Sequence, residues 1–276
     1  RKPERLIMSY FIRKLRTQLN ELVWISLIYL NDREFAKWHF KYAKKILKFQ
    51  DIHKDKDCFI IGNGPSLRNM DLSPLNNYYT FGLNKIHLLM DKTHLNVSYH
   101  VAVNPLVIEQ SAEDFEKLQC PSFISYRCGN RIIKPLDHIN YIITQGPNVK
   151  YTFQTNLLQG IHEGYTVTFV AMQIAFFMGF KRVFLIGVDH NFIAKGKENE
   201  KQYLAGEDPN HFDPTYFSNK EWHLPDLEAS ELSYHLARFF YSRDNRSIYD
   251  ATVDGKLNIF PKISYDQALE IAKRKN

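Results

Sequence analysis

From residue 57 onward, short apolar runs alternate with polar loops and with longer helical stretches. The apolar runs are too short for helices, and several end in Gly, Asn or Asp, which is typical of buried strands in a parallel sheet. Strands are predicted at residues 57–61, 78–84, 96–103, 122–126, 141–143, 182–189 and 247–252. Strands that alternate with helices indicate an α/β fold, a Rossmann-like, doubly wound and mostly parallel sheet.

Three helices are predicted among and after the later strands. Residues 166–178 are apolar on nearly every side, which indicates a buried helix, and Gly179 ends it. Residues 227–243 form a second helix, and a third closes the chain. Between the first two, residues 190–226 are polar with scattered aromatic residues and no clear periodicity, which is typical of a lid or a binding loop.

Residues 1–56 differ from the domain at residues 57–276. They contain no glycine, and fourteen Lys and Arg face six Asp and Glu. Apolar positions predict two helices joined near Asn31-Asp32, with either residue capping the second helix and Glu34 in its first turn. A basic, aromatic helical extension of this kind is typical of a segment that binds an anionic membrane surface. Packing on the domain and an oligomer contact are equally open roles.

Composition and charge narrow the choice of partner and compartment. An apolar content of 44% is ample for a folded core, and a net charge of +6 suits an anionic substrate or membrane face. No RNA motif, zinc-finger spacing or basic recognition helix is found, so a nucleic-acid partner is not expected. Three cysteines without a framework indicate a reducing, cytoplasmic compartment. Residues 6–30 carry too many charges for a membrane-spanning helix, and no secretory cleavage pattern follows.

The first strand runs directly into Gly62-Asn63-Gly64-Pro65-Ser66. Glycines let the backbone turn sharply and approach a ligand closely, Pro65 suits a helix start, and Ser66 suits a cap or a phosphate donor. A strand, a glycine turn and a helix N-terminus together form an anion site. From the spacing alone, a phosphate-binding loop and a plain strand-to-helix turn are equally well supported.

Polar residues also follow three further strands, at Asn84, at Asn104, and at Asp189 with His190. The carboxyl ends of parallel strands meet at one edge of a sheet, where such folds bind ligands. This convergence favours a nucleotide site. Leu67 stands where a third glycine would complete a dinucleotide fingerprint, so a nucleotide sugar is favoured over NAD.

Residues 60–67, Ile-Ile-Gly-Asn-Gly-Pro-Ser-Leu, resemble the opening of the bacterial sialyltransferases of glycosyltransferase family 42, where this segment holds the CMP part of CMP-sialic acid. Asn84, Asn104-Pro105 and residues 179–189 resemble later motifs of that family, in the same order. Gly164 stands where those enzymes have an Arg, which leaves the sugar open. The resemblance implies a GT-A-variant fold with donor contacts from Gly62, Asn63, Gly64, Pro65, Ser66, Asn84, Asn104 and Asp189.

The later part of the chain resembles a broader family that includes the Maf-type flagellin glycosyltransferases and the MptE-like, archaeal hydroxymethylpterin diphosphokinases. The matching segments are Gly-Tyr-Thr-Val at 164–167, Asn-His-Phe at 210–212 and an Ala-Thr-x-x-Gly-x-Leu-x-x-Phe pattern at 251–260. The two resemblances together cover about residues 57–262 and add Thr166 to the donor contacts.

The sialyltransferase resemblance implies a histidine base in the lid region and tyrosine hydroxyls on the leaving phosphate. His211 is the first candidate for the base, His190 the second, and Tyr216 the tyrosine; a loop-structuring role for His211 is the alternative. The Asp55-Lys56-Asp57 run has the form of a metal motif but precedes the first strand, at the wrong end of the sheet. It is interpreted as a solvated turn, and no metal or other cofactor is expected.

The expected function is therefore a bacterial glycosyltransferase that moves a sugar, CMP-activated by preference, to a surface glycan, glycolipid or glycoprotein. Residues 1–50 would hold the enzyme near the inner face of the membrane, and a homo-oligomer is an alternative role for them. Two other functions stay open: a Mg²⁺-dependent diphosphokinase of the hydroxymethylpterin type, and a non-catalytic nucleotide-sugar-binding subunit.

Overall fold

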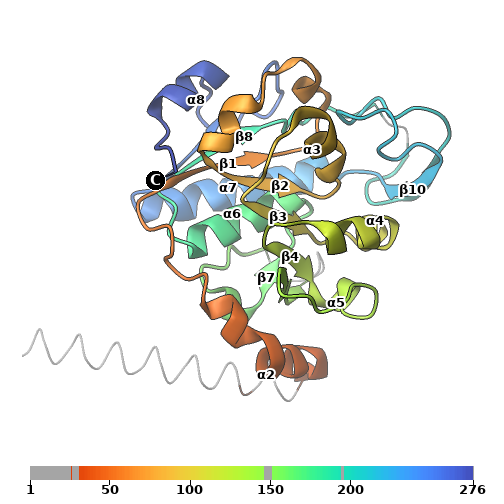
Figure 1. Cartoon of the computed structure of the whole chain (residues 1–276), viewed down its shortest axis with the longest axis vertical. Helices are drawn as coiled ribbons and strands as arrows, with labels where there is room; N and C mark the ends of the chain where they lie inside the picture. Colours follow the sequence, from red (N-terminus) through yellow and green to blue (C-terminus); the bar gives the residue numbers. More distant parts are fainter. Residues whose placement is uncertain (1–25, 27–30, 146–150, 194–195, 276) are drawn as a thin grey trace, which may run out of the picture.

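The computed structural model describes residues 26, 31–145, 151–193 and 196–275. Its centre is a seven-stranded, wholly parallel sheet with the strand order β11-β8-β1-β2-β3-β4-β5 (Figure 1). The strands are β1 Asp57–Ile61, β2 Tyr79–Leu83, β3 Tyr99–Ala102, β4 Ser122–Ser125, β5 Ile139–Ile142, β8 Arg182–Ile186 and β11 Ser247–Asp250. The predicted Rossmann-like α/β fold is confirmed, although most strands are shorter than predicted and the fifth begins two residues earlier.

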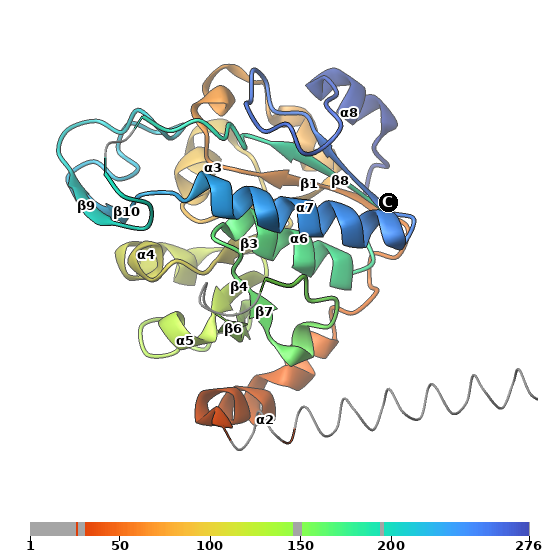
Figure 2. The same cartoon turned by 180° about the vertical axis from the view of Figure 1, so that it is seen from behind.

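Helices cover both faces of the sheet. The face towards the viewer in Figure 1 carries α3 (His87–Thr93) and α4 (Pro105–Lys117), and Figure 2 shows α6 (Val167–Phe177) and α7 (Leu227–Arg243) on the opposite face. The helix predicted at 166–178 is confirmed: Thr166 caps it, nine of its eleven residues are buried, and Gly179 follows with a φ of 90°. The shorter elements are α5 Tyr126–Gly129, α8 Tyr265–Ile271 and the 3₁₀ turns η1 Pro65–Asn69, η2 Ser73–Asn77 and η3 Leu157–Gln159.

The helix α2 (Arg33–Leu47) packs on the free edge of the sheet, next to β5. Asp32 caps it by accepting a hydrogen bond from the Phe35 amide at 2.9 Å, and Glu34 lies in its first turn, as predicted. Trp38 is wholly buried, and its indole donates to the Tyr141 carbonyl in β5 at 2.7 Å. Of the roles considered for the N-terminal extension, packing on the domain is the one that the structure shows for α2. The first predicted helix, at 22–30, lies almost wholly outside the described residues.

The region 190–226 contains regular structure that the sequence did not predict. Two short strands, β9 (Lys201–Leu204) and β10 (Lys220–His223), pair antiparallel and form a ribbon beyond the end of the sheet (Figure 2). Both strands have largely exposed or half-exposed residues, so they lack the apolar alternation by which strands are recognised. A second small parallel pair, β6 (Thr144–Gln145) with β7 (Ile161–His162), was also not predicted.

The interpretation of Asp55-Lys56-Asp57 as a solvated turn is wrong for Asp57. Asp57 is the first residue of β1 and is 1% exposed. Its two carboxylate oxygens accept hydrogen bonds from the Arg182 guanidinium of β8 at 3.0 and 2.7 Å. A buried carboxylate requires such a partner. Asp57 thus ties two central strands together at the amino edge of the sheet, far from the strand ends where ligands bind.

Most buried apolar residues of the described chain lie in the sheet and in the helices that cover it, where they form the hydrophobic core. All five residues of β1 are buried, and Cys58 is a free thiol within that strand. Within the part of the chain that is described, no helix combines the length and the apolar character that a membrane crossing requires.

Candidate active site

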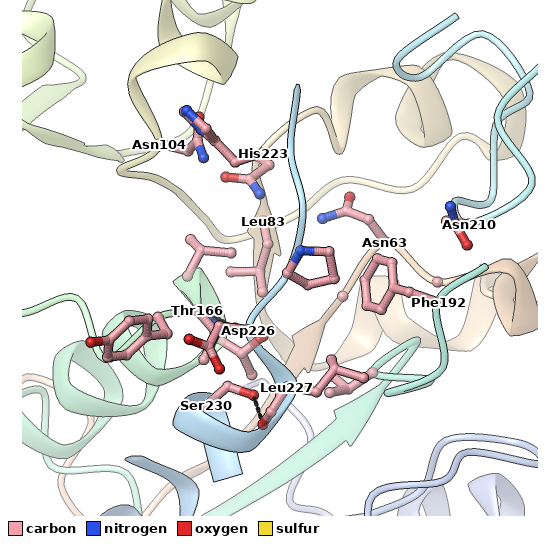
Figure 3. Close-up of a pocket in the computed structure, with 18 of the residues that line it drawn as sticks. Asn63, Leu83, Asn104, Thr166, Phe192, Asn210, His223, Asp226, Leu227 and Ser230 are labelled. Atoms are coloured by element: carbon pink, nitrogen blue, oxygen red, sulfur yellow. Dashed lines mark hydrogen bonds between the residues drawn. The ribbon is translucent and has the colours of Figure 1, made fainter. Parts of the chain in front are cut away.

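A cavity of about 580 Å³ opens at the carboxyl ends of the central strands (Figure 3). The loops after β1, β2, β3 and β8 form its floor, and the starts of α6 and α7 and the lid region form its walls. The predicted site residues that line it are Gly62, Asn63, Gly64, Asn84, Asn104, Thr166, Asp189, His190 and His211. Loops that are distant in sequence therefore meet at one edge of the sheet, as expected from its parallel topology.

The glycine loop after β1 is shaped by contacts within the protein. A Cβ at Gly62 would lie 2.2 Å from the Gly187 carbonyl oxygen, and a Cβ at Gly64 would lie 1.8 Å from a carboxylate oxygen of Asp189. The amide and the hydroxyl of Ser66 donate to the two oxygens of Asp189 at 2.9 and 2.7 Å. The carboxylate of Asp189 thus takes the place expected for a phosphate at this turn, and the loop is locked to the end of β8.

Burial raises the pKa of Asp189, and the two hydrogen bonds from Ser66 oppose part of that rise. The Asp189 carboxyl group is therefore held in a half-buried position by donors of the glycine loop. Of the two roles expected for Ser66, a cap or a phosphate donor, its hydroxyl performs neither in this structure, because it is engaged by Asp189.

Two asparagine side chains on the cavity wall keep unpaired oxygen atoms. Asn63 Oδ1 and Asn84 Oδ1 are buried and have no hydrogen-bond partner among the described residues. A buried amide without a partner is costly, so such atoms point to a ligand that completes them. Asn104 differs, because its Oδ1 accepts from the Leu106 and Val107 amides and caps α4. The Asn104 oxygen is therefore used by the fold, although the residue lines the cavity.

His211 is held by a carboxylate from its own loop. His211 Nδ1 lies 2.8 Å from Asp208 Oδ2, and the imidazole stacks on the ring of Tyr216 at a centroid distance of 4.0 Å. Asp208 is 1% exposed and also accepts from the amides of Asn210 and Phe217, so its position is fixed. A carboxylate on Nδ1 assigns the proton to that nitrogen and leaves Nε2 as a free base. The pair has the geometry of a general base with its orienting group.

His190 forms a second histidine–carboxylate pair. Its Nε2 lies 2.8 Å from Glu231 Oε1 on α7, and its backbone adopts the left-handed region with a φ of 52°. A non-glycine residue in this conformation carries strain that the surrounding structure must hold. Close by, the Thr166 hydroxyl accepts from the Thr168 amide and lies 3.3 Å from the Tyr234 hydroxyl. The cavity is thus flanked by one histidine pair in the lid and another at the end of β8.

Three predicted site residues do not line the cavity: Pro65, Ser66 and Tyr216. Pro65 begins η1 as predicted, and Ser66 faces Asp189. Tyr216 is 1% exposed, and its hydroxyl accepts from the Lys85 amide at 3.3 Å. Burial raises the pKa of Tyr216. These contacts do not agree with a hydroxyl that reaches a leaving phosphate; Tyr216 is instead the stacking support beneath His211.

Lys85 anchors the lid region to the loop after β2. This lysine is 1% exposed; its ammonium donates to the Tyr216 carbonyl and to Gln110 Oε1, both at 2.7 Å. It also lies over the Phe217 ring, 4.5 Å from the centroid. Burial, with the nearby charge of Lys220, lowers the pKa of Lys85 to about 7. No sequence pattern indicated this role, since an isolated Lys after a strand is usually solvated.

Arg68 anchors the same lid segment to η1. Its guanidinium donates to the carbonyl of His211 at 2.6 Å and to that of Phe212 at 3.2 Å. The Phe212 amide in turn donates to the Asn63 carbonyl at 2.8 Å. The backbone around His211 is therefore fixed to the turn that follows the glycine loop.

Sequence reasoning missed much of the remaining cavity wall. The acidic lining residues are Glu163, Asp189 and Asp226, and burial raises the pKa of Glu163. Among the lining residues that the structure describes there is no Lys and no Arg. A search of the described residues also finds no group of three or more His, Cys, Asp or Glu side chains placed to hold a metal ion. Asp208 was within reach of sequence reasoning, three residues before His211, whereas Glu231 lies in a helix with no distinguishing pattern.

A family model described as 6-hydroxymethylpterin diphosphokinase MptE-like matches residues 34–195. The chain belongs to this MptE-like family. The match confirms the MptE-like part of the expected resemblance, and it begins in α2, where the resemblance was expected only from residue 57. In this MptE-like chain the matched segment includes Asn63, Asn84, Asn104, Asp189 and His190. It ends before the β9–β10 ribbon and His211.

Among solved structures, a Maf glycosyltransferase from Magnetospirillum magneticum AMB-1 matches 83% of this chain with a TM-score of 0.49 and 12% sequence identity. The chain spans 38% of the length of that protein. No curated protein matches the chain.

Proposed function

We propose that this protein transfers a sugar from a CMP-activated donor to a hydroxyl group of a bacterial surface glycan, glycolipid or glycoprotein. In this proposal His211 is the general base and no metal ion takes part. The observation that carries it is the charge of the cavity: three carboxylates lie among its lining residues, with histidines and amides as the other polar groups, and neither Lys nor Arg is among the described lining residues. Membership of the MptE-like family supports a nucleotide-dependent transferase in general.

The charge of the cavity favours a donor with a single phosphate. A triphosphate placed beside Glu163, Asp189 and Asp226 meets like charges without a Lys or Arg on the described wall to balance them. A phosphodiester such as that of a CMP-sugar brings less negative charge and is satisfied by neutral donors and by histidine. Asn63 and Asn84, which line the cavity, suit this task through their side-chain NH₂ groups, which donate to phosphate oxygens, whereas their unpaired Oδ1 atoms would accept from hydroxyl or amino groups of the donor.

The reaction requires an acceptor hydroxyl to lose its proton while the bond from the sugar to the phosphate breaks. His211 Nε2 would take that proton, and Asp208 would hold the imidazole and stabilise it once it is protonated. His190, kept in place by Glu231, would stand near the leaving phosphate and balance its charge when protonated. Thr166, at the start of α6, would contact the donor through its hydroxyl.

Calorimetric titration and a transfer assay test the proposal. We expect CMP to bind without added metal and ATP to bind more weakly. We expect His211→Ala to lower the rate of sugar transfer by about 10²- to 10⁴-fold, the usual contribution of a general base, while CMP still binds. Absence of CMP binding would refute the choice of donor, and an unchanged rate in His211→Ala would refute the base. Donor binding without transfer to any acceptor would point to a non-catalytic binding subunit.

A second candidate is favoured by the description of the matched family model, which names a 6-hydroxymethylpterin diphosphokinase: in this proposal a diphosphoryl group passes from ATP to a hydroxymethyl group. The same His211 and Asp208 would deprotonate the hydroxyl, and Mg²⁺ would be required on the phosphates of ATP. The two functions separate cleanly with EDTA. Loss of ATP turnover in EDTA supports the diphosphokinase, and sugar transfer that persists in EDTA excludes it.

A further inference from the structure

The helix α2 has an inner face that fixes it rigidly to the domain. Phe35, Trp38, Ala43 and Ile46 are buried against the sheet edge. The guanidinium of Arg127, in α5 directly after β4, forms ion pairs with Asp32 and Glu34 at the start of the helix. The helix therefore does not depend on a further partner for its folding, and its outer face has a defined orientation.

The outer face carries a row of cations, which we call the basic stripe: Arg33, Lys37, Lys41, Lys44 and Lys48. Successive members are three or four residues apart, so they lie on one side of the helix. All five are exposed, and none forms an ion pair with another described residue. The two acidic residues at the start of α2 are both taken by Arg127. Among the described residues, the basic stripe is thus a positive surface without acidic partners.

Large apolar side chains are exposed within and just beyond the basic stripe. Phe40 is 84% exposed and stands beside Lys41, Leu47 is 46% exposed beside Lys48, and Ile52 is 47% exposed. Cations interleaved with apolar side chains fit a surface that is anionic outside and apolar immediately beneath. A lipid bilayer has that structure, whereas duplex nucleic acid presents its phosphates outermost with its bases stacked inside.

We propose that the basic stripe docks the protein flat on an anionic lipid bilayer, with Phe40 and Leu47 entering the headgroup region. Figures 1 and 2 agree that α2 lies at the edge of the sheet opposite α8 and apart from the β9–β10 ribbon, so docking leaves the lid uncovered. Asp32, which caps α2, meets Arg127 just after the carboxyl end of β4. The amino end of α2 therefore lies at the end of the sheet where the strands terminate and the cavity opens. Docking through α2 holds the cavity near the membrane surface.

Co-sedimentation of the full chain with lipid vesicles tests this proposal. We expect binding to vesicles of phosphatidylcholine mixed with phosphatidylglycerol, little binding to phosphatidylcholine alone, and release by salt, because screening weakens exposed charges. The triple variant Lys37→Glu/Lys41→Glu/Lys44→Glu should lower the partition coefficient by more than about a hundredfold, since each Lys near an anionic surface is worth about fivefold. Phe40→Ala should lower vesicle binding while leaving binding to heparin unchanged.

A matched control reverses three exposed cations elsewhere, Lys117, Arg243 and Arg274, for the same change in net charge. It should bind mixed vesicles as the unaltered chain does. Equal losses in both triple variants would mean a general charge effect and would overturn the proposal. Unchanged binding of the stripe variant would assign any lipid contact to another part of the chain, and equal binding to phosphatidylcholine alone would also refute the basic stripe. The altered side chains are all exposed, so each variant is expected to fold. Thermal unfolding checks this.

Discussion

At the scale of single residues, the strand ends divide into groups that the fold uses and groups that it leaves open. Asp189 and Ser66 satisfy each other, and the Asn104 oxygen caps α4. The oxygens of Asn63 and Asn84 are buried without partners among the described residues. Because an unmet buried polar atom is costly, ligand contact is expected at the two asparagines and not at Ser66.

The role of Asp208 can be separated from that of His211. Asp208→Asn keeps the size of the side chain but presents an amide to His211 Nδ1, which disfavours the tautomer with a free Nε2. We expect the transfer rate to fall by about a hundredfold or more, with the affinity for CMP little changed. In a His211→Ala background the same change should cost almost nothing further, because two groups that act as a unit are not additive. Additive losses in the double variant would contradict this pairing.

The glycine loop should tolerate no side chain at Gly64. In Gly64→Ala the new Cβ would lie 1.8 Å from Asp189 and force the loop away from β8. We expect the free energy of unfolding to fall by about 1–3 kcal/mol, as for overpacked sites, together with weaker CMP binding; denaturant unfolding and calorimetry measure the two. Gly206→Ala is the control for CMP binding: a Cβ there meets nothing within 4 Å, and the variant is strained only through its φ of 84°, outside the cavity lining. Equal losses of CMP binding in both variants would refute the specific role of Gly64.

At the scale of elements, the lid region is held to the domain around the residue that carries the base. Arg68 binds its backbone from η1, and Lys85 binds it from the loop after β2. The β9–β10 ribbon adds a further tie, because Gln110 of α4 donates to the Glu221 carbonyl at 2.7 Å. These contacts fix the backbone that positions His211, while the ribbon itself remains largely exposed.

Removal of the Arg68 contacts should loosen this segment without unfolding the protein. Arg68 is exposed, so we expect Arg68→Ala to change the free energy of unfolding by less than about 1 kcal/mol. The transfer rate should nevertheless fall by about tenfold or more, because small displacements of a catalytic group are expensive. Limited proteolysis should cut residues 205–219 faster. An Arg243→Ala control, on the far end of α7, should change neither property, and an unchanged rate in Arg68→Ala would contradict the anchoring role.

At the scale of the whole molecule, a buried lysine links folding to pH. The pKa of Lys85 is lowered from 10.5 to about 7 by burial, so the unfolded chain keeps a proton that the folded chain has lost between those pH values. The free energy of unfolding attributable to Lys85 therefore rises as pH increases from about 7 to 10.5. Below pH 7 the lysine is protonated while buried in the folded protein, so the desolvation penalty that it imposes on stability is greatest there.

Substitution of this lysine should expose the linkage directly. Lys85→Met removes the titrating group, so we expect the stability of the unaltered chain relative to the variant to increase from pH 7 towards pH 10.5. Urea unfolding at a series of pH values gives this difference and cancels groups common to both proteins. Lys117→Met, at an exposed lysine, is the control for the loss of one positive charge. A flat profile for Lys85→Met would mean that the lysine titrates alike in both states.

Apolar patterning gave the parallel sheet, the buried helix α6 and the capping of α2 by Asp32, since these depend on neighbours in sequence. It also placed Asn63, Asn84, Asn104 and Asp189 at one edge, because strand ends in a parallel sheet converge. It failed for the β9–β10 ribbon, whose residues lack alternation, and for Asp57, whose partner Arg182 is distant in sequence. Tyr216 was predicted to contact the leaving phosphate, but its side chain is buried beneath His211, because the direction of a loop side chain is not encoded locally.

The sequence by itself determined which elements form and which polar residues end the strands, because periodicity and turn chemistry are local properties. The tertiary structure decided how those polar groups are shared. It assigned Asp189 to Ser66 and Asp208 to His211, and it placed Lys85 beneath the lid. Hydrogen bonds between distant segments depend on packing distances of tenths of an ångström, and these arise only when the whole sheet, its helices and the lid are assembled.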